Sequence, residues 1–298
     1  MADITFQDRV AIVTGAGGGL GRSHALLLAG RGAKVVVNDL GGSVDGSGGS
    51  HSAADAVVDE IRAAGGEAVA SYDSVASAEG GAAIVRAALE AFGRVDIVVN
   101  NAGILRDASF HKMTLEQWDA VLAVHLAGTM HVSHAAWPHL REQGYGRIVN
   151  TTSVAGLFGN FGQANYGAAK MGIVGLTKVL AIEGAKKNIK VNAIAPIARS
   201  RMTEALLPEA ILAKLEPERV SPVVAYLASE RCPVSGQVLS AGGGYVSRIE
   251  TLEGPGTVFD AAFSIEDVAE RWDAITTLDG AQSYSGTDQA LAKVLGKL

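Results

Sequence analysis

The sequence predicts an α/β fold in which a doubly wound parallel sheet carries helices on both faces. Short apolar runs without polar alternation recur along the chain, and segments of helical character separate them. Strands of that kind are buried on both faces, which is typical of a parallel sheet. The chain has 298 residues, of which 48% are hydrophobic, so it can form one large α/β domain. Right-handed crossovers in such a sheet place ligands at the carboxyl ends of its strands.

The order of the elements supports this fold. Val-, Ile- and Ala-rich runs predict six strands, over residues 9–15, 34–39, 67–73, 95–103, 146–153 and 190–196. Helical periodicity between them predicts helices over residues 20–31, 53–66, 80–93 and 114–140, and a fifth that carries Tyr166 and Lys170. Residues 204–215 read as an amphipathic lid helix. A long Gly/Ser-rich loop, Leu40 to His51, follows the second strand, although the fold does not need it.

The chain is predicted to form one dinucleotide-binding domain over residues 1–245 and a C-terminal extension over residues 246–298. In the extension, Ser264 and Asp267 have the spacing of a helix capping box. A segment of about fifty residues with few apolar side chains is too small to fold alone. We therefore expect it to pack on the same domain or on a neighbouring subunit.

Composition excludes several classes of function. The formal net charge is −6 and no basic run is longer than Lys186-Lys187, so nucleic acid is not expected as a partner. No apolar run approaches the length of a membrane span, and the start "MADITFQDRV" lacks the pattern of a signal peptide. The single cysteine, Cys232, rules out an internal disulfide and suits a reducing compartment. These features predict a cytoplasmic protein that acts on a small molecule.

A glycine-rich turn, "TGAGGGLG", connects the first strand to the first helix. Such a turn lets the backbone approach a pyrophosphate, whose charge then lies at the helix N-terminus. Asp39 ends the second strand, where a carboxylate accepts hydrogen bonds from the adenosine ribose. A carboxylate there repels a 2′-phosphate, so the sequence favours NAD over NADP. A tight turn without a ligand is the plainer alternative for the glycines, and a turn-forming role is the alternative for Asp39.

Polar residues also follow the third and fourth strands. Asp73 and Ser74 are placed to reach the adenine, and Asn100 and Asn101 to hold the geometry of the strand end. Taken singly, each is a common turn residue. Together they fall along one edge of the predicted sheet, where a dinucleotide would lie.

These motifs, with Tyr166 and Lys170 four residues apart and Ser153 upstream, resemble the short-chain dehydrogenase/reductase family. The resemblance covers about residues 9–245 and implies a Rossmann-like doubly wound sheet. "VVVNDLGG", "NNAGILRD", "GNFGQANYGAAK" and "IAPIARSRMT" are similar to the (3R)-hydroxyacyl-CoA dehydrogenase domains of peroxisomal multifunctional enzyme type 2 and to their bacterial stand-alone relatives. The first motifs specify the family, and the others specify this subgroup.

The resemblance implies that Tyr166 is the general acid/base, that Ser153 orients the substrate oxygen, and that Lys170 assists. A phenol with a pKa of about 10 is poorly matched to neutral pH. One positive charge ~4–5 Å away is worth roughly 3–4 kcal/mol at an effective dielectric of about 20. We therefore expect the Lys170 ammonium to lower the pKa of Tyr166 towards neutrality, and to bind the nicotinamide ribose.

Two positions depart from the family pattern. His125 stands where many members have an Asn that holds a relay water, so its part in proton relay is open: packing is one reading and relay the other. Ile197 replaces the Gly that usually follows the proline of the sixth strand. The predicted cofactor-binding set is Gly15, Gly19, Leu20, Gly21, Asp39, Leu40, Asp73, Ser74, Val75, Asn100, Asn101, Ala102, Gly103, Tyr166, Lys170, Pro196, Ile197, Ala198 and Thr203.

The substrate is expected to be an acyl-CoA, bound at Ser153 beside a wall that includes Phe158, Phe161 and Met202, although ordinary core packing is an equal reading for each wall residue. A hydroxysteroid dehydrogenase or a 3-oxoacyl-carrier-protein reductase would use the same residues. An NAD-sensing regulatory protein is the alternative from another class. No metal site is predicted, because the neighbouring histidines lack acidic partners. The resemblance implies a homodimer or homotetramer, with Gly172 and Gly175 allowing close helix packing between subunits.

Overall fold

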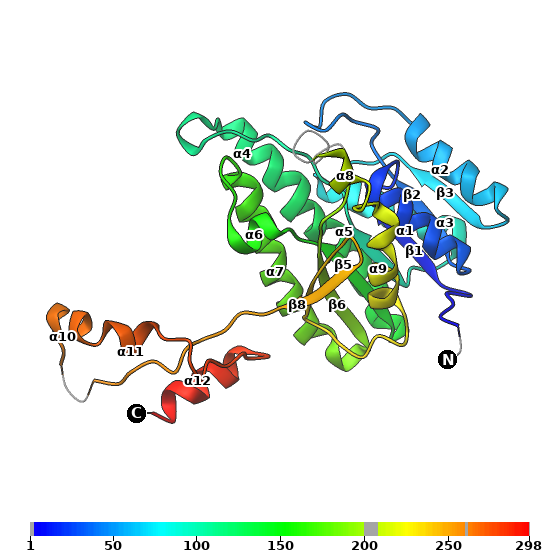
Figure 1. The fold of residues 1–298 in the computed structure, drawn as a ribbon. Helices are drawn as coiled ribbons and strands as arrows, with labels where there is room; N and C mark the ends of the chain where they lie inside the picture. The colour runs from blue at the N-terminus through cyan, green and yellow to red at the C-terminus, as the bar shows by residue number, and fades with distance from the viewer. Residues whose placement is uncertain (1–2, 200–207, 260–261, 298) are drawn as a thin grey trace. The chain divides into compact units, whose positions relative to one another are not determined.

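A computed structural model describes residues 3–199, 208–259 and 262–297. In this part of the chain eight strands form one sheet in the order β3-β2-β1-β4-β5-β6-β7-β8, with helices on both faces (Figure 1). The pairs from β3 through to β7 are all parallel. The order reverses between β1 and β4, as in a doubly wound sheet. The predicted α/β class is confirmed.

Eight strands are present, of which the first six agree with the predicted apolar runs and the last two were not predicted. They are β1 (Val10–Thr14), β2 (Lys34–Asn38), β3 (Glu67–Ser71), β4 (Ile97–Asn100), β5 (Gly146–Thr151), β6 (Ile189–Pro196), β7 (Val238–Gly242) and β8 (Tyr245–Ile249). The helices of the same unit are α1 (Gly19–Gly30), α2 (Ser52–Ala63), α3 (Ala78–Phe92), α4 (Leu115–Leu122), α5 (Gly128–Gln143), α6 (Val154–Phe158), α7 (Ala164–Gly184), α8 (Glu209–Leu212) and α9 (Ser221–Ala228).

Two apolar cores cover the faces of the sheet. Successive side chains of a strand point to opposite faces, so Ala11 and Val13 of β1 join one core while Val10 and Ile12 join the other. Helices α1, α2 and α9 cover the first face, and α3, α5 and α7 cover the second. Because both faces are dry, the strands need no polar alternation. A ligand can therefore reach the sheet only at the ends of its strands.

The predicted helix over residues 114–140 is present and contains a π-helical turn. Thr114 and Gln117 form a capping box at the start of α4, and α5 ends before Gly144, which has a φ of 66°. Between the two helices lies a π-helical turn, η2 (Ala123–Ala127), with His125 at its centre. Such turns insert one residue into an α-helix and often occur at functional sites. Hydrophobic periodicity does not reveal a single inserted residue, so the helix was predicted correctly and the π-helical turn within it was not.

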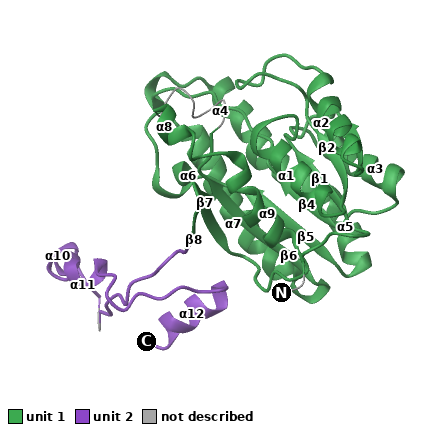
Figure 2. Cartoon of the chain, turned by 45° about the vertical axis from the view of Figure 1, so that its right-hand side comes forward, with its two compact units in different colours: residues 1–248 green, residues 249–298 purple. Residues whose placement is uncertain are grey.

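The chain divides into two compact units, residues 1–248 and residues 249–298 (Figure 2). The second unit contains α10 (Ile265–Glu270), α11 (Trp272–Thr276) and α12 (Thr287–Leu295). Ser264 and Asp267 form the predicted capping box of α10. None of these three helices has a buried residue, and Trp272 is 56% exposed. The described residues of this unit belong to none of the apolar cores.

No helix in the described parts of the chain combines the length and apolar character needed to cross a membrane.

Candidate active site

The glycine turn after β1 is shaped by contacts that exclude side chains. Gly15 and Gly19 have φ angles of 63° and 51°, in the left-handed region that favours glycine. A Cβ on Gly21 would lie 2.1 Å from the carbonyl oxygen of Gly15, so only glycine fits where α1 begins. The backbone can therefore approach a ligand closely at the N-terminus of α1. This cradle fits the pyrophosphate of a dinucleotide.

The carboxylate of Asp39 binds the backbone of the glycine turn and of the loop after β2. It accepts hydrogen bonds from the Gly17 and Gly41 amides, both at 2.7 Å. Arg22, on the first turn of α1, is held by Glu60 at 2.6 Å and is not directed to Asp39. The Asp39 carboxylate is therefore held beside the glycine turn by two backbone amides.

The ends of β1 and β4 are joined by side chains at the carboxyl edge of the sheet. The Thr14 hydroxyl accepts hydrogen bonds from the Asn101 and Ala102 amides at 3.0 and 3.1 Å. The Asn101 side chain donates to the Thr14 and Gly15 carbonyls at 3.0 Å each. The predicted role of Asn101 in holding the strand end agrees with these bonds. Thr14 was missed by the sequence reasoning, although it directly precedes the glycine turn.

Asn100 and Asp73 have structural partners of their own. The Asn100 amide donates to Asn150 and Ser133, at 2.9 Å each. The carbonyl oxygen of Asp73 accepts from the Asn38 amide at 2.9 Å. These bonds hold the ends of neighbouring strands in register, so both residues contribute to the shape of the edge.

Tyr166 and Lys170 lie on one face of α7, as the i, i+4 spacing predicts. The Lys170 Nζ is 5.5 Å from the centre of the Tyr166 ring and donates a hydrogen bond of 2.6 Å to the Thr151 carbonyl. Ser153 is the N-cap of α6 and hydrogen-bonds the Tyr166 side chain. Three of the four residues predicted to be catalytic, Ser153, Tyr166 and Lys170, are therefore brought together at the carboxyl end of β5, and the fourth is His125.

Burial governs the protonation of this group. Burial raises the pKa of Tyr166, the hydrogen bond to Ser153 lowers it, and the charge of Asp107 raises it, with a net rise. Burial lowers the pKa of Lys170 to about 7. The expectation that Lys170 brings the pKa of Tyr166 towards neutrality is not met by the protein's own groups, because burial disfavours both charged forms.

His125 packs edge-on against the Tyr166 ring, with 5.1 Å between ring centres. Its Nε2 lies 2.8 Å from the Ile104 carbonyl oxygen and 3.0 Å from the Ile104 nitrogen, whereas its Nδ1 has no hydrogen-bond partner among the described residues. Burial and the nearby Lys170 charge hold the pKa of His125 well below its usual range. The imidazole is therefore neutral, and its contacts with the Ile104 backbone hold the loop after β4 in place.

Gly103 leaves the space that this imidazole occupies. A Cβ there would lie 2.4 Å from His125 Cε1, so Gly103→Ala must displace the ring. We expect a loss of about 1–3 kcal/mol in unfolding free energy, as for other overpacked sites, together with reduced kcat. Thermal unfolding and steady-state assays would measure both. Gly30→Ala is the matched control, because a Cβ at Gly30 meets nothing within 4 Å. Equal behaviour of the two variants would contradict this role for Gly103.

The remaining predicted site residues are placed less decisively. Phe158 and Phe161 are 73% and 90% exposed, so in this unit they line no closed substrate wall. Met202 and Thr203 lie outside the described residues. The other members of the predicted cofactor set lie in or beside the strand ends and their turns: Leu20, Leu40, Ser74, Val75, Pro196, Ile197 and Ala198.

Asn165, directly before Tyr166, is a second residue that the sequence reasoning missed. It is fully buried, and its side chain donates to the Arg106 and Gln117 carbonyls at 3.0 and 3.1 Å. Its Oδ1 also accepts from the Tyr166 amide at 2.7 Å. Asn165 thus fixes the start of α7 to the loop after β4. Its only sequence signal was its place beside Tyr166.

One expectation about subunit packing needs correction. A Cβ on Gly172 would lie 2.9 Å from the side chain of Leu126 in η2. The small size of Gly172 therefore serves packing within the subunit. Gly175 has no neighbour within 4 Å of such a Cβ, and it faces open space.

Comparison with known proteins agrees with this geometry. Residues 9–209 match the family model described as short chain dehydrogenase. A Mycobacterium tuberculosis protein named only as a short-chain type dehydrogenase/reductase is 60% identical over 276 residues, which is 93% of this chain and 96% of that protein. The peroxisomal hydratase-dehydrogenase-epimerase of Saccharomyces cerevisiae is 54% identical over 92% of this chain. This chain spans only 31% of the length of the yeast protein.

Among solved structures, the full-length peroxisomal multifunctional enzyme type 2 of Drosophila melanogaster matches with a TM-score of 0.84 at 41% sequence identity. The match covers 98% of this chain and 50% of that one. The likeness therefore extends over both units of the chain and is close in sequence as well as in fold.

Proposed function

The chain belongs to the short-chain dehydrogenase family, and from that premise we propose that it is an NAD-dependent enzyme that interconverts (3R)-3-hydroxyacyl-CoA and 3-oxoacyl-CoA. As a member of the family it is an oxidoreductase that acts on CH–OH groups. The observation that carries the proposal is the grouping of Ser153, Tyr166 and Lys170 at the strand ends beside the glycine turn. The cofactor and the acyl-CoA substrate are the parts that need testing.

In the proposed mechanism, Ser153 and Tyr166 hold the substrate oxygen between their hydroxyl groups. A nicotinamide supplies the hydride chemistry when it is bound. During oxidation the Tyr166 phenolate takes the hydroxyl proton, and during reduction the phenol returns it. Lys170, fixed by the Thr151 carbonyl, supplies positive charge near Tyr166 and a donor for the ribose. His125 stays neutral, and its Nδ1 is free to accept a hydrogen bond from a water molecule of a proton relay. We therefore assign His125 to positioning this water and not to taking up the relayed proton itself.

The carboxylate of Asp39 supports NAD over NADP as the cofactor. We expect Asp39→Asn to lower kcat/KM for NAD by about tenfold, because it loses a charge-assisted hydrogen bond, and to raise that for NADP by removing repulsion of the 2′-phosphate. Steady-state kinetics with both cofactors on one preparation would measure the ratio. The two cofactors act as internal controls for folding. If the ratio of kcat/KM for NAD to that for NADP did not change, Asp39 would have no part in selecting the cofactor.

The acyl-CoA assignment is supported by the sequence similarity to the hydratase-dehydrogenase-epimerase and to the multifunctional enzyme. The test is NADH formation from short-chain and sterol-sized 3-hydroxyacyl-CoA esters in both configurations. We expect turnover of the (3R) esters alone, and the better of the two would indicate the size of the pocket. If free hydroxysteroids or acyl-carrier-protein thioesters gave the higher kcat/KM, the substrate assignment would pass to that class.

A homodimer or homotetramer is part of the proposal. Met171, Gly175, Val179 and Ile182 share one face of α7. Met171, Val179 and Ile182 are 46%, 52% and 58% exposed, and Gly175 leaves room for close approach. An apolar helix face of this kind suits pairing with a second copy. The single buried cysteine, Cys232, supports a reducing compartment such as the cytoplasm.

A further inference from the structure

Thr152 lies between the end of β5 and Ser153, and the mechanism proposed above gives it no role. It is 1% exposed, so its side chain is enclosed by the protein. Its amide donates a hydrogen bond of 2.8 Å to the Ile194 carbonyl, which continues the pairing of β5 with β6 by one residue. The backbone of Thr152 is thereby fixed to the sheet, and its side chain starts from a defined point at the carboxyl edge.

The Thr152 side chain joins this edge to α7, the helix that carries Tyr166. Its hydroxyl donates a buried hydrogen bond of 2.7 Å to the Lys170 carbonyl, eighteen residues further along the chain. Lys170 lies inside α7, where a carbonyl ordinarily accepts from the amide four residues ahead. The bond from Thr152 is therefore not needed to satisfy the helix. It fastens the helix to the strand end.

Lys170 is held at both ends by successive residues. Its Nζ donates to the Thr151 carbonyl at 2.6 Å, and its own carbonyl accepts from Thr152. The next residue, Ser153, hydrogen-bonds the Tyr166 side chain. A lysine side chain is long and flexible, so its ammonium keeps one position only where the backbone is held as well. Three consecutive residues thus meet both members of the pair on α7.

Gly156 brings α6 against the same point of α7. A Cβ on Gly156 would lie 2.7 Å from the Lys170 Cβ and 3.0 Å from the Met171 nitrogen. The two helices therefore approach closely beside Lys170, which leaves α7 little room to move towards α6. The bond from Thr152 limits movement away from the end of β5. The backbone of Lys170 is held from two sides.

We propose that Thr152 is a positioning residue for Lys170. Its hydroxyl fixes α7 against the end of β5, and so sets where the ammonium lies relative to the Tyr166 hydroxyl and the ribose of the cofactor. Thr152 acts through Lys170 and takes no part in the proton transfer itself. The inference rests on the proposed roles of Tyr166 and Lys170, so its test includes a measurement that needs no turnover.

The first test compares two substitutions of Thr152 in steady-state oxidation of a 3-hydroxyacyl-CoA. Thr152→Val keeps the branched shape and removes the hydroxyl, whereas Thr152→Ser keeps the hydroxyl. We expect Thr152→Val to lower kcat by about thirtyfold with little change in KM, since a displacement of about 1 Å in a catalytic site can cost about a hundredfold. Thr152→Ser should retain most of the activity, because its hydroxyl can still donate to the Lys170 carbonyl.

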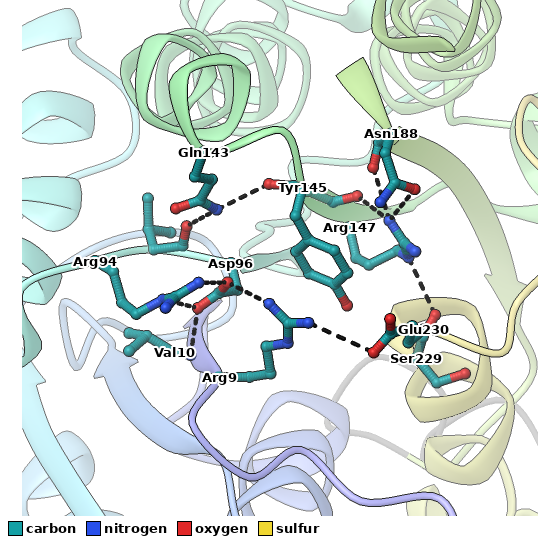
Figure 3. A network of polar contacts seen from close by, with 12 residues as sticks. Arg9, Val10, Arg94, Asp96, Gln143, Tyr145, Arg147, Asn188, Ser229 and Glu230 are labelled. Carbon is teal, nitrogen blue, oxygen red and sulfur yellow. Dashed lines mark hydrogen bonds and ion pairs between the residues drawn. The ribbon is translucent and has the colours of Figure 1, made fainter. Parts of the chain in front are cut away.

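Ser229→Ala is the control for the loss of a buried hydroxyl. Ser229 is 1% exposed, and its hydroxyl donates to the Tyr226 carbonyl at the end of α9, also at 2.7 Å. It belongs to a polar network at the amino end of β5 (Figure 3), where its carbonyl accepts from Arg147 Nε at 3.1 Å. The variant loses the same kind of bond at the opposite edge of the sheet. It should lower Tm as Thr152→Val does, but leave kcat unchanged.

The second test follows the protonation of Lys170 without any substrate. The Cε signals of isotope-labelled lysine are titrated by NMR, and Lys170→Met identifies the signal of Lys170. Burial lowers the pKa of Lys170 to about 7. Thr152→Val should raise this pKa towards the ordinary value of a lysine, because a loosened α7 lets water reach the ammonium. Thr152→Ser and Ser229→Ala should leave it close to that of the wild type.

The two tests separate this inference from the proposed function. A wild type that turns over no substrate would contradict the proposed function, and the NMR titration would still decide the role of Thr152. An unchanged pKa of Lys170 in Thr152→Val would overturn the inference. An equal loss of kcat in Thr152→Val and Ser229→Ala would overturn it too, because the bond would then serve only the stability of the fold.

Discussion

Tyr166→Phe should reduce kcat for alcohol oxidation by about a thousandfold, within the range attributed to a positioned general acid/base. The phenol hydroxyl is the only group of Tyr166 that the change removes, and the ring that packs against His125 remains. Cofactor affinity and thermal stability should therefore stay close to those of the wild type. Steady-state kinetics, together with calorimetric titration of NAD, would measure both.

Tyr226→Phe is the matched control, because Tyr226 is 41% exposed on α9. A fall of less than about tenfold for Tyr166→Phe would contradict its role as acid/base, given the usual contribution of such groups. Retained NAD binding in a wild type that turns over no hydroxyacyl, steroid or acyl-carrier substrate would instead support the sensor alternative. A sensor has no need for the hydroxyl of Tyr166.

The pH dependence follows from the same group. Burial raises the pKa of Tyr166, and the active form for oxidation is the phenolate, so kcat/KM for oxidation should rise with pH through the neutral range. For reduction the phenol is the active form, so kcat/KM should stay level through the neutral range and fall only at high pH, where Tyr166 ionises. Because the hydrogen bond to Ser153 lowers the pKa of Tyr166, Ser153→Ala should move the limb of the oxidation profile to higher pH.

The fold was predictable because its signals are local. Each strand from β1 to β6 is a continuous apolar run, since helices bury both of its faces. The π-helical turn at His125 was not predictable, because one inserted residue changes the hydrophobic pattern too little to detect. Strand β7 and the edge strand β8 were also missed. Tyr245 and Val246 are 67% and 49% exposed, so this strand has no buried pattern.

The candidate site was predictable where chemistry fixes both residue type and spacing, as for Tyr166 and Lys170. The supporting contacts were not, because they depend on which chain segments meet in space. The Lys170 ammonium is bound by the Thr151 carbonyl, and Asn165 binds the carbonyl of Arg106. Every residue has a backbone carbonyl, so the sequence does not show which carbonyl a side chain will bind. The extent of burial, which raises the pKa of Tyr166 and lowers that of Lys170, was hidden for the same reason.

The buried Lys170 should lower the free energy of unfolding. We therefore expect Lys170→Met to give a protein that is inactive but more stable. Burial lowers the pKa of Lys170 from 10.5 to about 7. Between these values the unfolded chain holds the proton and the folded chain does not, so this group makes stability rise with pH across that window. Below about pH 7 both states hold the proton, and the folded state bears the full cost of a buried charge.

At pH 7 that cost is about 5 kcal/mol by the free energy of a pKa shift. The hydrogen bond to Thr151, worth about 1–3 kcal/mol, is lost in the variant. We therefore expect Lys170→Met to gain roughly 2 kcal/mol, which raises Tm by about 4–8 °C in a chain of this size. Lys187→Met, at an exposed position, is the control. Thermal unfolding between pH 6 and 10 should show the gain shrinking as pH rises. A gain that stays constant with pH, or a loss at pH 7, would contradict the prediction, because the stability would then not depend on a lowered pKa of Lys170.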